Sequence, residues 1–309
     1  MDKSLLYIAL LPLLAIPAFF SSGMVDNKTI PAVKHGYSLS LSEDPKCIDC
    51  HSDLIESSII HGPASQSCDN CHHVDIIEHT KNGARGLNLV KNVPDLCFSC
   101  HDDFKKEIDA FPKTHQVLKK ENSCVTCHSP HSSDDKNLLV SEQKKLCLSC
   151  HNKDLTETGE KITNIKILLA NSKVIHPPVQ KGCVVCHQPH GSENNYLLIS
   201  AFPKGNYATA VKDTFAVCWE CHDSDLLELA KTDAATNFRD GDRNLHFVHM
   251  NGRKSKSCIM CHNVHASENE HLIETKVQYG GWEMPIKYIP TETGGSCFPG
   301  CHVEKTYTR

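Results

Sequence analysis

The sequence repeats one short motif, Cys-x-x-Cys-His, along most of its 309 residues. Eight copies have this spacing, and a ninth, Cys297–His302, has three residues between its cysteines. The nine pairs use all 18 cysteines: Cys47 and Cys50, Cys68 and Cys71, Cys97 and Cys100, Cys124 and Cys127, Cys147 and Cys150, Cys183 and Cys186, Cys218 and Cys221, Cys258 and Cys261, and Cys297 and Cys301. The histidines that end the motifs are His51, His72, His101, His128, His151, His187, His222, His262 and His302.

This spacing is the signature of covalent c-type haem attachment. The two thiols add across the vinyl groups of the haem, and the histidine binds the iron from one face. Structural zinc and disulfides are the alternatives, because both use paired cysteines. Neither needs a histidine after every second cysteine. We therefore expect nine covalently attached haems c.

The length of the chain limits the core that it can build. A chain of 309 residues suggests two ordinary domains, but nine haems leave roughly 34 residues for each, too few for a conventional apolar core around every cofactor. Aromatic residues are only 6% of the chain. We expect a mostly irregular fold with short α-helices and little or no β-sheet, in which porphyrins supply much of the buried apolar surface.

The first residues resemble a secretory signal peptide. Lys3 precedes an apolar run from Leu5 to Phe20, and small residues follow it at 21–23. An uncleaved membrane anchor is the alternative, although the run is short for a span. We expect a leader over residues 1–24, removal of which leaves no permanent membrane span. Export fits the chemistry, because c-type haem is attached outside the cytoplasmic membrane.

The rest of the chain divides into one single-motif segment and four two-motif repeats. Each repeat has an upstream histidine, a first motif, usually a histidine three residues later, an insert and a second motif. The expected divisions are an N-terminal single-haem segment over 25–60 and two-haem repeats over 61–114, 115–175, 176–245 and 246–309, the last with the stretched motif.

The inserts carry the secondary structure that we expect. Segments 102–110, 142–150 and 223–231 begin with acidic or polar residues and are predicted to be helical. Segment 162–170 is apolar and fits either a helix or a strand. Glycine and proline in segment 266–296 predict a loop. Each motif is expected to lie on a helical turn, so that both cysteines and the histidine face one porphyrin.

Nine of the 21 histidines end motifs, which leaves twelve to supply a second ligand to each iron. The repeat predicts seven of these distal ligands: His61, His115, His131, His176, His190, His249 and His265. His35 is expected to serve the N-terminal segment, and either His73 or His79 replaces the histidine missing at Asp75. We expect His246 and His271 to lie at the surface or near haem propionates. Methionine is the alternative ligand type, but Met250, Met260 and Met284 do not recur in the repeat.

The length of the chain between two histidines decides which iron they can share. Three residues span at most about 10 Å, whereas imidazoles on opposite faces of one iron need α-carbons roughly 12 Å apart. His131 therefore has to serve a haem other than the one that His128 binds, and the same holds for His190 and His265. Neighbouring haems are thereby linked by a few residues of backbone.

The pattern at Cys124–His151 and at Cys183–His222 resembles the doubled-CxxCH multihaem cytochrome c family, which it matches at His128, Pro130 and His131 and again at His187, Pro189 and His190. The run CDNCHH at 68–73 is similar to a motif of the cytochrome c3 group, in which the second histidine serves a neighbouring haem, and this favours His73 over His79. The resemblance covers roughly residues 47–302. It implies periplasmic or extracellular electron transfer, in some members as the periplasmic component of a porin–cytochrome conduit.

We therefore expect an electron carrier, not an enzyme, in which bis-histidine haems connect a quinol-linked or periplasmic donor to a terminal acceptor or an outer-membrane conduit. The partners are other redox proteins, such as periplasmic or outer-membrane cytochromes and a porin. The net charge of −5, made more negative by haem propionates, gives no basic stripe for nucleic acid. Two alternatives remain, a multihaem reductase of nitrogen or sulfur oxyanions and a subunit of a conductive filament. The expected location is the periplasm or the cell surface.

The haem count gives the first test. We predict nine haems per mature chain, measured by pyridine haemochromogen against protein concentration and by intact mass. Eight haems, with unmodified cysteines at Cys297 and Cys301, would show that the stretched motif carries none.

Overall fold

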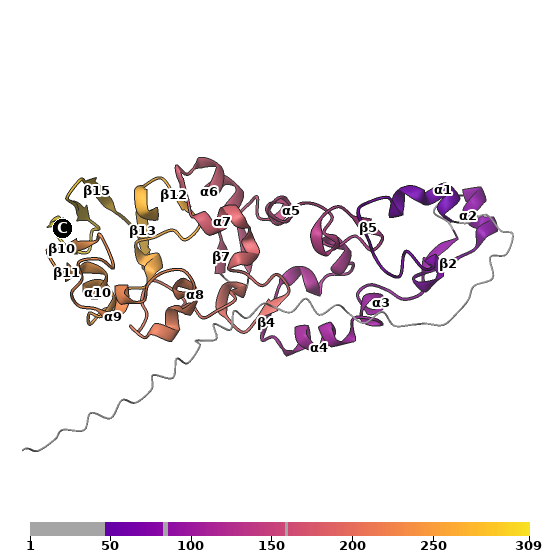
Figure 1. Ribbon diagram of the computed structural model, residues 1–309, viewed down its shortest axis with the longest axis horizontal. Coiled ribbons are helices and arrows are strands. Elements are labelled where there is room, and N and C mark those ends of the chain that lie inside the picture. Colours follow the sequence, from indigo (N-terminus) through magenta and orange to yellow (C-terminus); the bar gives the residue numbers. More distant parts are fainter. Residues whose placement is uncertain (1–46, 83–85, 158–159) are drawn as a thin grey trace, which may run out of the picture. The chain divides into compact units, whose positions relative to one another are not determined.

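The computed structural model describes residues 47–82, 86–157 and 160–309 (Figure 1). The expected leader and His35 lie outside these residues. The described chain consists of short helices and very short strands joined by irregular segments. The α-helices are α1 (Ile48–His51), α2 (Ile76–Asn82), α3 (Asp95–Phe98), α4 (Asp102–Ala110), α5 (Gln143–Cys150), α6 (Ile165–Asn171), α7 (Pro177–Lys181), α8 (Ala216–Trp219), α9 (Asp225–Glu228) and α10 (Leu245–Met250).

Single turns of 3₁₀ helix are as frequent as α-helices in the described chain. They are η1 (Ser52–Ile55), η2 (Cys68–Asn70), η3 (Gln116–Lys119), η4 (Cys124–Thr126), η5 (Lys136–Leu138), η6 (Cys183–Val185), η7 (Asn195–Leu197), η8 (Lys212–Phe215), η9 (Cys258–Met260) and η10 (Glu270–Leu272).

The strands pair antiparallel in small sheets. Two-stranded sheets join β1 (Ile59–Ile60) to β5 (Ser132–Ser133), β2 (His72–Val74) to β3 (Leu87–Leu89), β4 (Lys113–Thr114) to β9 (Gly191–Ser192), β6 (Leu155–Glu157) to β7 (Glu160–Ile162), β8 (Val174–Ile175) to β12 (Ala266–Ser267), β10 (Arg239–Asp240) to β11 (Arg243–Asn244) and β13 (Lys276–Tyr279) to β14 (Trp282–Pro285). One three-stranded sheet has the order β15 (Lys287–Thr291), β16 (Gly294–Phe298), β17 (Lys305–Thr308). The expected class, mostly irregular with short helices and little sheet, is confirmed.

Two helices that the sequence predicts from their acidic first residues are present in the structure. Helix α4 occupies the predicted segment 102–110. Helix α5 begins one residue after Glu142, whose carboxylate accepts hydrogen bonds from the backbone N–H groups of Lys144 and Lys145 at 2.9 and 2.8 Å. In segment 162–170 the chain ends strand β7 and then forms α6, which Asn164 caps by accepting from the backbone of Ile167.

Two predictions of local structure differ from the structure. The helix expected over 223–231 is only the single turn α9. The loop expected over 266–296 is wrong, because this segment holds hairpin β13–β14 and strands β15 and β16. Gly280, at φ +57°, lies in the hairpin turn, where a positive φ is required. Pro290 lies in β15 at the edge of its sheet, where a residue without an N–H group is tolerated.

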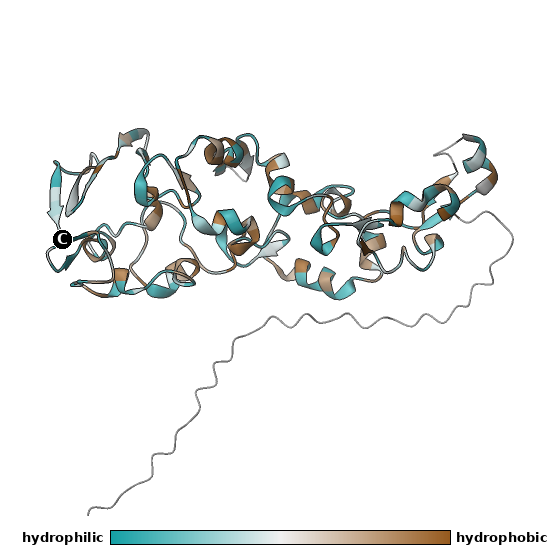
Figure 2. Cartoon of the chain, turned by 45° about the horizontal axis from the view of Figure 1, so that its top comes forward, coloured by the Kyte–Doolittle hydropathy of each residue, from teal (hydrophilic) through white to brown (hydrophobic). Residues whose placement is uncertain are grey.

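Buried apolar side chains are few and lie against the haem motifs. Figure 2 shows hydrophobic residues spread along the short elements. Cys186, Cys218 and Cys258 pack against one buried cluster, and Cys261 and Cys297 pack against the other. The first cluster is Leu198, Phe202, Phe215, Leu227 and Met250, and the second is Met260, Val277 and Ile286. Five of the cysteines that would attach haem are therefore part of the apolar packing of the described chain.

Asn244 gives a stability test, because it is fully buried and joins α9 to α10. Its Oδ1 accepts from the backbone of Phe247, and its Nδ2 donates toward the carbonyls of Asp225, Leu226 and Leu229 at 3.2, 3.2 and 2.8 Å. Asn244→Ala should lower the free energy of unfolding by about 1–3 kcal/mol, because carbonyls and an N–H lose buried partners. Denaturant titration followed by circular dichroism measures the change.

Asn164→Ala is the matched control, because Asn164 caps α6 but is not fully buried. It should cost about 1 kcal/mol. Equal losses for the two variants would show that the buried contacts of Asn244 add nothing to an ordinary helix cap.

Candidate haem sites

Most of the motifs fold as single helical turns. In seven of them the backbone N–H of the histidine donates to the carbonyl of the first cysteine, as from His128 to Cys124 at 2.9 Å and from His187 to Cys183 at 3.1 Å. The seven histidines are His51, His101, His128, His151, His187, His222 and His262. The stretched motif differs from the expected helical turn, since Cys297 lies in strand β16.

Eight motif histidines each face a second imidazole. The ring centroids lie 6.0–6.4 Å apart, and seven of the pairs are close to parallel, with interplanar angles of 7–27°. The eighth pair, His51 with His79, is tilted by 41° at 6.0 Å. The parallel pairs are His72 with His131, His101 with His61, His128 with His190, His151 with His115, His187 with His265, His222 with His176 and His262 with His246.

This separation fits an iron held between two imidazoles. A metal–nitrogen bond is about 2 Å, and the ligating nitrogen lies about 1 Å from the centre of its ring, so two rings on opposite sides of one iron have centroids about 6 Å apart. Rings in van der Waals contact would lie closer. The residues present therefore fit haem c at these eight motifs, with two cysteines for attachment and two histidines for the iron.

The ninth motif brings His302 near His249, whose ring lies against that of Phe238 with centroids 5.7 Å apart. His302 lies close enough to His249 for its charge to contribute to the lowered pKa of His249, after burial, which is the largest cause. The Nδ1 of His302 lies 2.6 Å from the carbonyl of Val303, and that of His249 lies 2.7 Å from the carbonyl of Leu245. Both rings thus keep Nε2 free, the atom that an iron would take.

The structure places most of the candidate distal histidines beside a motif histidine. Six lie opposite one, and His249 lies near His302: the six are His61, His115, His131, His176, His190 and His265. His79, on α2, faces His51, whereas His73 is exposed and faces no motif histidine in the described chain. Of the two candidates that the sequence offers, His79 is thus the one that lies beside a motif histidine.

His246 was expected at the surface or near haem propionates, but it is half-buried and faces His262 at 6.3 Å. Helix α10 carries His246 and His249 one turn apart, so a single helix presents imidazoles to two motifs. Burial lowers the pKa of His246 to about 3, which keeps the ring neutral with a lone pair available to a metal. The spacing of three residues between the two histidines was the available signal.

Three motif histidines are each oriented by a loop, and the three loops have the same conformation. The Nδ1 atoms of His128, His187 and His262 lie 2.8–2.9 Å from backbone carbonyls nine residues further on, in η5, η7 and η10. The residues that supply these carbonyls and the ones that follow them have φ of 53–59°, which is unusual for residues other than glycine. They are Asn137 and Leu138, Tyr196 and Leu197, and His271 and Leu272. The strained turns aim two successive carbonyls at the motif and hold its imidazole.

A buried serine holds each of these loops. The hydroxyl of Ser192 donates to the carbonyl of Leu198 at 2.6 Å and accepts from the backbone N–H of Asn194 at 2.9 Å. Ser133 and Ser267 make the corresponding two hydrogen bonds in their loops. The serine lies five residues after the motif histidine in all three loops, and this spacing is the signal in the sequence that marks them.

Short strands join distal histidines from different repeats. The backbone N–H of His61, next to β1, donates to the carbonyl of His131, next to β5, at 2.8 Å. In the same way, pairing of β4 with β9 joins His115 to His190, and pairing of β8 with β12 joins His176 to His265. Each link connects the ligands opposite two consecutive motifs, so the repeats are interlocked through their distal histidines.

The cysteines place consecutive motifs side by side. The first cysteines lie beside each other in four pairs of motifs: Cys47 and Cys68, Cys97 and Cys124, Cys147 and Cys183, and Cys218 and Cys258. Second cysteines meet in the intervening pairs: Cys71 with Cys100, Cys127 with Cys150 and Cys186 with Cys221, with Cys261 beside both Cys297 and Cys301. In the second set, the neighbouring thiol contributes after burial to a raised pKa. Every motif therefore neighbours the motifs before and after it in the sequence.

Comparison with known proteins agrees with this architecture. Residues 61–106, 115–156 and 176–226 match the family described as Doubled CXXCH motif. The chain is 28% identical to the multiheme cytochrome MtrA of Shewanella baltica over 252 residues, which are 77% of this chain and 63% of that relative. It is 24% identical to the cytochrome c-type protein NrfB of Escherichia coli O6:H1 over 143 residues, which are 40% of this chain and 74% of that relative.

The chain is thus a multihaem cytochrome c of the doubled-CxxCH family. Its cofactor is haem c. Within residues 47–82, 86–157 and 160–309, every helix is too short or too polar to cross a membrane.

The placement of His246 gives a direct test. In His246→Ala, one ferric haem should lose its second imidazole and give a high-spin signal in electron paramagnetic resonance, because the iron of the 258–262 motif would have no strong ligand on that face. His271→Ala is the matched control, because it is the backbone carbonyl of His271, in η10, that contacts His262, whereas its ring faces Tyr288 edge-on. It should leave all signals low-spin. A high-spin signal in the control and none in His246→Ala would reverse the assignment.

Proposed function

We propose that the chain binds nine haems c, each between two histidines, and carries electrons along them in the order of the sequence. The pairing of eight motif histidines with a second imidazole at 6.0–6.4 Å is the observation that carries this proposal. The proposed distal ligands are His61, His79, His115, His131, His176, His190, His246, His249 and His265. When bound, the haems supply one-electron redox centres, whose potentials bis-histidine ligation sets low relative to histidine–methionine ligation.

The contacts between cysteines support the proposed order. Because each attachment site touches the next along the chain, an electron that enters near one end can pass from neighbour to neighbour. The protein holds the ligands of neighbouring haems in fixed positions. Interlocked strands hold six distal histidines, and strained loops hold three motif histidines, so that these ligands need not reorganise when an iron changes charge.

We propose export to the periplasm or the cell surface and partners that are themselves redox proteins. The supports are the leader-like segment 1–24, the site of c-type haem attachment outside the cytoplasmic membrane, and likeness to a relative named multiheme cytochrome MtrA. The net charge of −5 favours basic partner surfaces. A quinol-linked donor and an outer-membrane or porin-associated acceptor fit these properties.

Binding of carbon monoxide distinguishes an electron carrier from a multihaem reductase. A catalytic haem needs an open or weakly held position on the iron. The dithionite-reduced protein should therefore show no Soret change with carbon monoxide and no steady-state turnover of nitrite, hydroxylamine or tetrathionate. His246→Ala is the positive control and should bind carbon monoxide at one haem. Binding at one haem of the unaltered protein, together with turnover, would replace the carrier with a reductase.

A further inference from the structure

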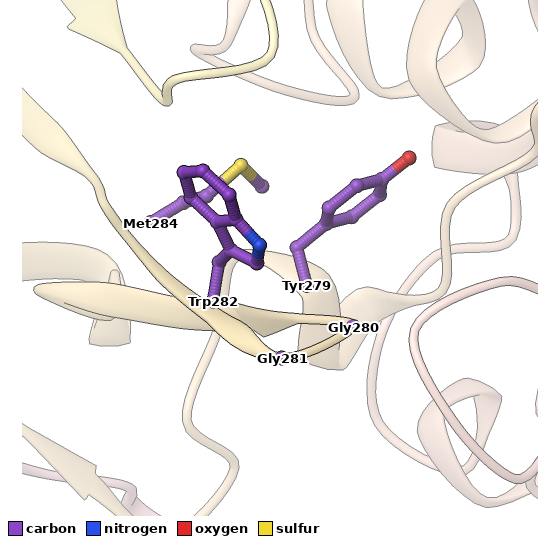
Figure 3. Close-up of a pocket in the computed structure, with 5 residues that line it drawn as sticks. All are labelled: Tyr279, Gly280, Gly281, Trp282 and Met284. Carbon is purple, nitrogen blue, oxygen red and sulfur yellow. The ribbon is translucent and has the colours of Figure 1, made fainter.

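The hairpin β13–β14 presents an apolar face that the electron-transfer chain described above does not use. In its register, Val277 pairs with Met284 and Tyr279 pairs with Trp282, so these four side chains share one face. Figure 3 shows the side chains of Tyr279, Trp282 and Met284 on the same side of the hairpin. They line a hollow of about 430 Å³ together with the turn at Gly280 and Gly281. The indole of Trp282 is 77% exposed, unusual for the largest side chain of a hairpin.

The stretched haem motif borders this face. A Cβ added to Gly300 would lie 3.4 Å from the Cβ of Met284 and 3.5 Å from its Sδ, which is van der Waals contact. Gly300 has φ +70°, a conformation that suits glycine. Met284 also packs on the buried cluster that adjoins Cys261 and Cys297. The glycine that precedes the second cysteine of the motif therefore lies directly against the hairpin.

A second contact joins the hollow to the motif from the other side. The phenol of Tyr207 hydrogen bonds with that of Tyr279, and its pKa is raised by burial first and then by the nearby charges of Tyr279 and Cys301. Asn206 fixes this segment by donating from Nδ2 to the carbonyl of Gln278 in β13 at 2.7 Å. The hollow thus opens between a tyrosine beside Cys301 and a methionine on Gly300.

We propose that this face is the apolar wall of the haem attached to Cys297 and Cys301, with the ring of Trp282 and that of Tyr279 covering the macrocycle. The inference rests on the proposed function in one respect, that the ninth motif carries haem. A flat, apolar cofactor matches aromatic side chains on one face of a hairpin, and attachment at Cys301 sets it beside Tyr207. The extra residue of the motif has a use on this account, because Gly300 lets the motif approach Met284.

Oxidative footprinting of tryptophan tests this directly, because the chain has only Trp219 and Trp282. In the nine-haem protein, Trp282 should react slowly with hydroxyl radicals, since the haem covers its ring. In the eight-haem variant C297A/C301A, its rate should rise several-fold. Trp219, whose Nε1 donates to the carbonyl of Lys212 at 2.9 Å and which belongs to another motif, is the internal control and should not change. Peptide mass spectrometry measures both rates.

Other outcomes would overturn the inference. A rise at Trp282 only in C258A/C261A would assign the wall to the preceding haem. Fast reaction in the nine-haem protein, unchanged when the motif is removed, would make the hairpin a free surface. A wild-type count of eight haems would also overturn it, while leaving electron transfer through the other eight in place.

A second measurement keeps all nine haems and so does not depend on the folding of the cysteine variants. Trp282→Ala should lower the reduction potential of one haem-equivalent, because water that reaches the macrocycle stabilises the more charged ferric form. Trp282→Phe, which keeps an apolar ring, should restore most of the shift. Spectroelectrochemical titration that shows nine attached haems and no shifted component in Trp282→Ala would contradict the proposal.

Discussion

Two imidazole rings facing each other across about 6 Å are the interaction on which the rest of this structure depends. Apolar packing within the described chain is limited to small clusters such as that around Phe215, and most helices are one or two turns long. Elements of this length are not stable alone in water. Their arrangement makes sense when each is read as a support for a cysteine pair or a histidine.

The histidine pairs also explain why the repeats cannot be separate domains. His131 belongs to one repeat by sequence but faces His72 of the repeat before it, and the backbone of His131 bonds to that of His61. Each repeat therefore completes a site in its neighbour. Loss of His131, His190 or His265 should therefore disturb a site in the repeat before the one that carries the substitution. This exchange of ligands gives a rigid order of sites without a large core.

Much of the candidate site could be predicted from the sequence, because covalent attachment fixes residue type and spacing together. The steric argument that His131 must serve another haem than that of His128 agrees with the pairing seen here. Spacing could not choose between His73 and His79, since the choice depends on helix α2 turning His79 toward His51. The repeat did not indicate His246, because this histidine has no counterpart in the other repeats. The sequence did not indicate hairpin β13–β14, because glycine and proline occur at strand turns and sheet edges as well as in loops.

The central claim is that every iron lies between the two histidines named for it and that consecutive haems are neighbours. An experimental structure of the haem-loaded protein, with irons located by anomalous scattering, tests this most directly. We expect nine irons, each between a motif histidine and its named partner, with His79 opposite His51 and His246 opposite His262. We also expect the nearest irons to belong to consecutive motifs. An iron bound by His73 or His35 at the first motif, or a nearest neighbour from a distant repeat, would contradict it.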